Sequence, residues 1–97
     1  MTTRTVYLKR GPFDGACSVA SHDTAIHRGE VYVWDGSANR DSFVHAASAV
    51  RVLSDVQRRE ETQRVSNWME HPEIPLQADI PAWRVNAWMQ LIRLDAT

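Results

Sequence analysis

The segment IPAWRVNAWMQLIRL, residues 80–94, is the most apolar part of the chain and holds two of its four tryptophans. At about 100° per residue its apolar side chains form two stripes along a helix, whereas a peripheral helix needs only one. Pro81 suits the first turn of such a helix. One stripe comprises Val85, Trp88, Met89 and Ile92, and the other comprises Trp83, Ala87, Leu91 and Leu94.

The two stripes predict that this helix is covered on two sides. We expect the Trp88 stripe to lie in the core. In the simplest arrangement a sheet covers the Trp88 stripe and a preceding helix covers the Trp83 stripe, because a small domain needs most of its apolar residues inside. The alternative is that the Trp83 stripe is open to a second copy of the chain or to a target, since tryptophan is favoured at binding hot spots.

Length and composition indicate one globular domain over residues 1–97. Hydrophobic residues make up 43% and charged residues 24%, which is ordinary for a folded domain. The 11 basic and 12 acidic residues balance to a net charge of −1, so the chain lacks the strong positive field typical of nucleic-acid binders. A single cysteine and the lack of a membrane-length apolar run predict a soluble protein of a reducing cytoplasm without a membrane partner.

Residues 1–40 are the β-rich half of the predicted domain. TVYLK (5–9), ACSVAS (16–21) and EVYVW (30–34) favour strands, with a possible short continuation at AIH (25–27). Turn formers lie between them, notably GPFDG (11–15). Both faces of EVYVW are apolar, so this strand is expected to be central or covered by helices. We predict an antiparallel sheet of about three strands.

Residues 41–97 are the predicted helical half, with two or three helices packed on the sheet, which makes the fold class α+β. Phe43, Ala46, Ala47, Val50 and Leu53 follow at helical spacing, and the apolar stripe is then interrupted over residues 55–64. The interruption is either the surface of one long helix or the junction of two helices. We favour one continuous helix to residue 70, because neither Gly nor Pro interrupts it. Prolines then predict an extended connection over residues 71–81.

No motif for catalysis, metal binding or a cofactor is present. The spacing of His22, Asp23 and His27 matches no zinc pattern, and Cys17 lies in a predicted strand where a buried structural thiol is more common than a nucleophile. GPFDG lacks the spacing of a phosphate-binding loop. We therefore predict a protein that is not an enzyme and has no cofactor, with a small metal protein or enzyme centred on His22, His27 or Cys17 as a remote alternative.

A protein-binding module is the leading hypothesis. The polar interruption supplies charged contacts, and two tryptophans supply apolar anchors. The alternative is a nucleic-acid-binding accessory or regulatory protein that places the same arginines on phosphates. A homodimer through the Trp83 stripe is also open. The predicted partner-binding residues are Arg58, Arg59, Glu60, Glu61, Arg64, Trp68 and Trp83.

TVYLKRGPFDGACSV (5–19), followed by YVWDG (32–36) and FVH (43–45), resembles a pattern in small phage and prophage proteins. In that pattern a strand leads into a GGPxDG-like turn, and an aromatic strand and a Phe/Tyr-x-His segment follow. Arg10 stands here where the first glycine would be. The resemblance implies a phage source and, by analogy with anti-CRISPR proteins, an inhibitor that occupies the surface of a host defence complex in the bacterial host cytoplasm. It supplies no catalytic residues.

Overall fold

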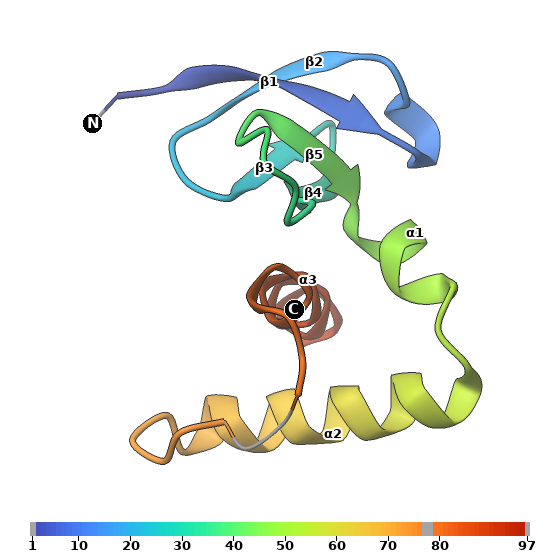
Figure 1. Ribbon diagram of the computed structural model, residues 1–97, viewed down its shortest axis with the longest axis vertical. Coiled ribbons are helices and arrows are strands. Elements are labelled where there is room, and N and C mark those ends of the chain that lie inside the picture. Colours follow the sequence, from blue (N-terminus) through green and yellow to red (C-terminus); the bar gives the residue numbers. More distant parts are fainter. Residues whose placement is uncertain (1, 77–78, 97) are drawn as a thin grey trace.

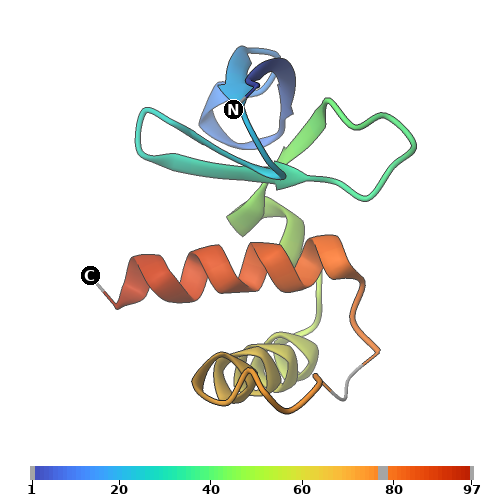
Figure 2. The same ribbon diagram turned by 90° about the vertical axis from the view of Figure 1, so that its left-hand side faces the viewer.

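The computed structural model describes residues 2–76 and 79–96, and it confirms the α+β class. Figures 1 and 2 show three layers, with the sheet at one end, α3 in the middle and α2 on the far side of α3. The short helix α1 joins the sheet to α2. The strands of these residues are β1 (Arg4–Lys9), β2 (Cys17–Ala20), β3 (Thr24–His27), β4 (Glu30–Trp34) and β5 (Ser42–His45), and the helices are η1 (Gly11–Phe13, 3-10), α1 (Ala46–Arg51), α2 (Asp55–Glu70) and α3 (Ala82–Asp95).

The sheet has five strands in the order β2-β1-β5-β4-β3 and is mixed. The prediction of about three antiparallel strands was wrong in detail, because β1 pairs with β5 in parallel, with Leu8 opposite Phe43. The missed strand β5 lies where the sequence indicated the start of a helix. Phe43 belongs to a cluster inside the curled sheet, whereas Val44 faces the helices. The sheet therefore extends beyond residue 40 and includes the first residues of the predicted helical half.

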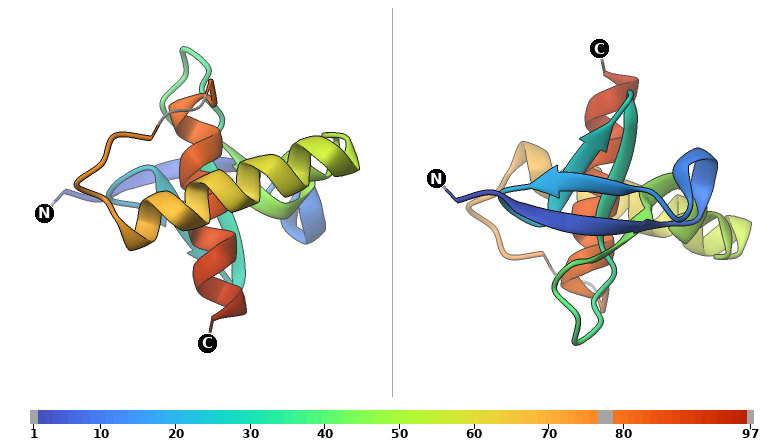
Figure 3. Two further views of the ribbon diagram at one scale, coloured as in Figure 1. Left: turned by 90° about the horizontal axis from the view of Figure 1, so that it is seen from below. Right: turned by 90° about the horizontal axis from the view of Figure 1, so that it is seen from above.

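The sheet folds over on itself, so that β1 and β2 cross above β3 and β4 (Figure 3). The edge strands β2 and β3 approach each other, and Ser18 Oγ lies 3.3 Å from His27 Nδ1. The Tyr32 hydroxyl holds the η1 turn, since it donates to Arg10 O at 3.1 Å and accepts from Phe13 N at 3.0 Å. The cluster enclosed by this curl comprises Val6, Leu8, Ala20, Ala25, Tyr32 and Phe43.

The two-faced character predicted for β4 is confirmed. Val31 and Val33 face the helices, whereas Tyr32 enters the inner cluster. β4 forms a hairpin with β3, a full strand that the sequence indicated only as a continuation. Its two-residue loop, Arg28–Gly29, has positive φ at both positions, 50° and 84°, which is the hairpin turn that matches strand twist.

The continuous helix predicted through residue 70 was wrong, because the chain breaks between α1 and α2. Ser54 starts the second helix: its Oγ accepts a hydrogen bond from Gln57 N at 3.1 Å, which satisfies one of the unpaired amides of the first turn. The break lets α2 change direction and cross α3 (Figure 3). Residues 55–64 lie together in α2, and Asp55 in its first turn pairs with Arg58.

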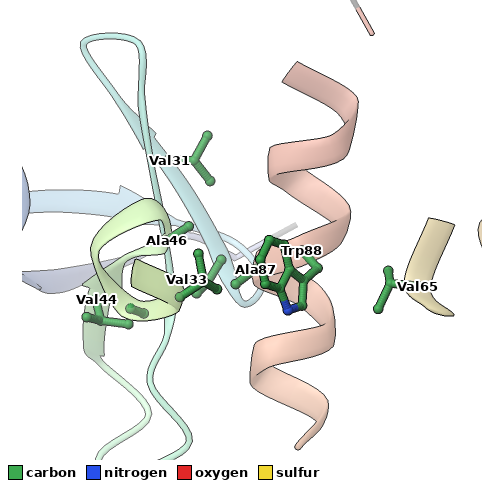
Figure 4. Close-up of a cluster of buried hydrophobic side chains, with 9 residues drawn as sticks. Val31, Val33, Val44, Ala46, Val65, Ala87 and Trp88 are labelled. Atoms are coloured by element: carbon green, nitrogen blue, oxygen red, sulfur yellow. The ribbon is translucent and has the colours of Figure 1, made fainter. Parts of the chain in front are cut away.

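α3 begins at Ala82, directly after Pro81, as the sequence predicted. Both Ala87 and Trp88 are buried, so the core position predicted for Trp88 is confirmed. However, we expected the sheet to cover the Trp88 stripe and the preceding helix to cover the Trp83 stripe, and the structure shows the reverse for Trp88 and Ala87. Trp88 faces α2, where Val65 lies, and Ala87 points toward Val33 of the sheet (Figure 4). The connection before α3 is irregular over residues 71–76 and 79–81, and Gln77 and Ala78 lie outside the described residues.

Candidate functional site

The predicted contact residue Glu61 is a structural residue instead. Only 7% of Glu61 is exposed, and its carboxylate accepts two hydrogen bonds from the Arg84 guanidinium, both at 2.8 Å. Trp88 Nε1 donates a third at 2.9 Å. Burial by itself raises the pKa of Glu61, but the hydrogen bonds from Arg84 and Trp88 and the charge of Arg84 outweigh it and lower that pKa. This Glu61–Arg84–Trp88 clasp fastens α2 to α3.

The remaining charged residues of the predicted stretch lie on the outside of α2. Arg59, Glu60 and Arg64 are exposed, and Arg58 is half-buried and paired with Asp55. The helix presents Glu60, Arg64 and Trp68 at i, i+4 and i+8, so these three lie along one side of it. The structure therefore brings part of the predicted set together around Arg64 and Trp68.

A groove lies where α2 ends and the irregular connection begins, and we call it the Trp68 groove. Its volume is about 310 Å³. Trp68 on α2 is half-buried, whereas Ile74 on the connection is 56% exposed, so apolar surface faces solvent here. The residues that line the groove are Arg64, Asn67, Trp68, His71, Ile74, Pro75 and Leu76.

A second hollow continues from the Trp68 groove along α2. The two share Arg64, but the second hollow is smaller, at about 180 Å³, and more polar. Glu60 and Asp79 give it negative charge, and Ile80 contributes apolar surface. The side of α2 that faces the connection thus offers an apolar end at Trp68 and a charged end at Glu60, with Arg64 between them.

Trp83 does not belong to this surface. A Cβ built on Gly36 would collide with the Trp83 ring, so the loop between β4 and β5 covers part of this side chain. Ala87 of the same stripe is fully buried, whereas Leu94 is 48% exposed. The chain itself therefore covers much of the Trp83 stripe that the sequence left open to a second copy. The uncovered part of Trp83 lines a different hollow, with Trp34.

A hydrogen-bonded series of polar side chains, which sequence reasoning missed, joins Glu30, His45 and Ser48. His45 Nε2 lies 2.9 Å from Glu30 Oε1, and His45 Nδ1 lies 2.7 Å from Ser48 Oγ. His45 is 8% exposed, and Gly11 packs against its ring so closely that a Cβ would not fit. None of the hollows described above is lined by these residues. The series ties β4, β5 and α1 together.

The three residues of the alternative metal or enzyme site, His22, His27 and Cys17, have different surroundings. His22 lines the hollow with Trp34, whereas the His27 ring packs edge-on against Phe13 at 4.8 Å between centroids. Cys17 is exposed on β2, so the expected buried thiol was wrong. Within residues 2–76 and 79–96, His, Cys, Asp and Glu side chains do not gather in threes or more in a way that could hold a metal ion.

The comparisons with known proteins add no relative from which a role could be transferred. No protein-family model matches the chain, no curated protein is significantly similar to it, and no solved structure matches it. In the part of the chain that the structure describes, no helix has both the length and the apolar character needed to cross a bilayer. The site must therefore be interpreted from its own chemistry.

Proposed function

We propose that this protein is a non-enzymatic protein-binding module that receives a partner polypeptide in the Trp68 groove. The observation that carries the proposal is that the half-buried Trp68 and the 56%-exposed Ile74 line the same groove, which has a volume of about 310 Å³. A tryptophan held in this way offers a large apolar area at small entropic cost, which is the property of a binding hot spot. An apolar side chain of the partner fills the space between Trp68 and Ile74.

The charged side chains beside the groove orient the partner as it binds. Arg64 lines the groove, and Arg59 and Glu60 are exposed one turn away on α2. Charges at the rim of an interface mainly steer association and select the partner, whereas the buried apolar anchor supplies most of the affinity. We therefore assign the anchor to Trp68 and a steering role to Arg59, Glu60 and Arg64.

Binding in this way makes the protein an inhibitor by steric occlusion. A rigid domain that occupies the surface of its partner blocks that surface without any chemical step. The resemblance of residues 5–19 to small phage proteins makes a host defence complex in the bacterial cytoplasm the first partner class to test.

Affinity capture with matched variants tests the proposal. The wild-type protein, Trp68→Ala and Val56→Ala are each immobilised and exposed to lysate of a bacterial host. Val56 is the matched control because it is an exposed apolar residue of α2, at 60%, that does not line the groove. A partner identified by mass spectrometry should be retained by wild type and Val56→Ala, and should be lost with Trp68→Ala. Binding is then measured with the purified partner.

Three results would count against a protein partner in the groove. One is that no protein is retained, and another is that Trp68→Ala retains the same proteins as wild type. The third is that the retained material is nucleic acid, with affinity that falls steeply as salt rises. That last result would favour the nucleic-acid-binding alternative.

A further inference from the structure

The hollow lined by Trp34 and Trp83, which we call the Trp34–Trp83 hollow, lies on the other side of α3 and combines two indole rings with a carboxylate. It has a volume of about 250 Å³ and contains Asp23 beside Trp34 and Trp83. Both tryptophans are half-buried, and the Asp23 side chain is 45% exposed. Aromatic rings beside a carboxylate are the surroundings that favour an organic cation, because the ring faces and the carboxylate both carry negative potential.

The walls of this hollow are held in place by backbone and amide hydrogen bonds. Asn86 Nδ2 donates to Thr24 Oγ1 at 3.0 Å and to Asp23 O at 3.3 Å, which fixes α3 against the start of β3. Trp34 Nε1 donates to Asn39 O at 3.2 Å. None of these bonds uses the Asp23 carboxylate, so an exchange of its charged partner would leave the walls in place. The hollow is therefore preorganised, which reduces the entropic cost of binding.

The chain itself already places a guanidinium against two of the residues that line the hollow. The Arg40 guanidinium carbon lies 4.0 Å from the centroid of the Trp34 ring, and Arg40 Nη2 donates to Asp23 Oδ1 at 2.7 Å. Trp34 and Asp23 together thus make both contacts that recognise an arginine side chain: a ring face and a charge-assisted hydrogen bond. The Arg40 side chain is 57% exposed on the loop between β4 and β5, so it can leave without opening the core.

We propose that the Trp34–Trp83 hollow binds the guanidinium of an arginine side chain from a partner protein, and that Arg40 is its internal competitor. The incoming arginine replaces Arg40 on Asp23 and Trp34, and Trp83 forms the wall of the hollow that Arg40 leaves unused. This site is separate from the Trp68 groove, so either assignment can fail without the other.

Titration of the Arg40→Ala protein with N-acetyl-arginine amide tests the proposal. The readout is the indole N–H signals of Trp34 and Trp83 in NMR spectra, assigned with Trp34→Phe and Trp83→Phe. Both signals should shift saturably, and wild type should need a higher concentration because Arg40 competes. Arg93→Ala, which removes an exposed arginine elsewhere on α3, should behave as wild type.

Two comparisons measure how much the charges of the ligand and of Asp23 contribute to binding. The citrulline analogue has nearly the same shape but no charge and should bind Arg40→Ala roughly two- to thirtyfold more weakly, the range that a cation–π contact supplies. Asp23→Asn in the Arg40→Ala background should also weaken arginine binding. Among residues 2–76 and 79–96 the hydrogen-bond partner of that carboxylate is Arg40, so the fold does not depend on it once Arg40 is gone. The absence of saturable shifts, or equal binding of the citrulline or lysine analogue, would overturn the assignment.

Discussion

The Glu61–Arg84–Trp88 clasp should contribute strongly to stability, and Glu61→Ala is the substitution that measures it. The substitution leaves the Arg84 guanidinium and Trp88 Nε1 without their shared acceptor. Removing one partner of a buried ion pair typically costs about 3–5 kcal/mol, because the other charge remains buried. The Arg84 side chain is 17% exposed, so water reaches part of it and the lower end, about 3 kcal/mol, is expected.

Urea unfolding followed by circular dichroism and tryptophan fluorescence measures this cost. A loss of about 3 kcal/mol corresponds to a decrease of roughly 12–24 °C in Tm for a domain of this size. Glu60→Ala is the matched control, since Glu60 is the adjacent glutamate on α2 but is exposed, and its loss should stay within about 0.5 kcal/mol.

A double-mutant cycle separates the pair from its surroundings. Arg84→Met alone leaves Glu61 buried without its cation, whereas Glu61→Ala/Arg84→Met removes both charges. The double variant should therefore be less destabilised than the sum of the two single variants, with a coupling of about 0.5–3 kcal/mol. If Glu61→Ala costs no more than Glu60→Ala, or if the two single effects simply add, the clasp is no stronger than a surface ion pair and the reasoning is wrong.

Three further predictions concern Glu61, Gly36 and Ser54. The lowered pKa of Glu61 means that its stabilising contribution is fully present above its ordinary value of 4.5 and is lost as pH falls through the folded-state pKa; the acid limb of a stability–pH curve should flatten in Glu61→Gln. Gly36→Ala should cost about 2 kcal/mol in urea unfolding because it adds a collision with Trp83 to a positive φ, and Gly29→Ala, with a similar φ but open space, should cost less. Ser54→Ala should cost about 1 kcal/mol through the lost helix cap, and an unchanged unfolding midpoint would contradict that role.

The features of the fold that are local in sequence were predictable. The two apolar faces of β4 indicated a covered strand, and Pro81 marked the start of α3 to within a residue. β5 was missed because Phe43 and Val44 are followed directly by α1, and the combined apolar spacing matches a helix. Its parallel pairing with β1 joins segments more than thirty residues apart, which no periodicity reports.

The candidate sites show the same limit. Trp68 and Arg64 were chosen from the sequence as partner contacts, and the structure places both in one groove. Glu61 was interpreted as surface because it interrupts an apolar stripe, but its partner Arg84 lies on a different helix. A polar residue at a core-facing position is a signal for a buried ion pair, yet the partner can only be found once the two helices are placed against each other.

α3 contributes to both of the proposed binding surfaces. Arg84 and Trp88 on one side fasten α2, whose end forms the Trp68 groove, while Trp83 and Asn86 on the other side form the wall of the hollow that contains Asp23. Substitutions within this turn of α3 would disturb both surfaces and the fold together, so they cannot separate binding from stability. Trp68 on α2 and Asp23 before β3 each line one of the two surfaces but do not belong to α3. Their variants should change one surface each and leave the clasp intact, which makes them the residues with which to separate the two proposals.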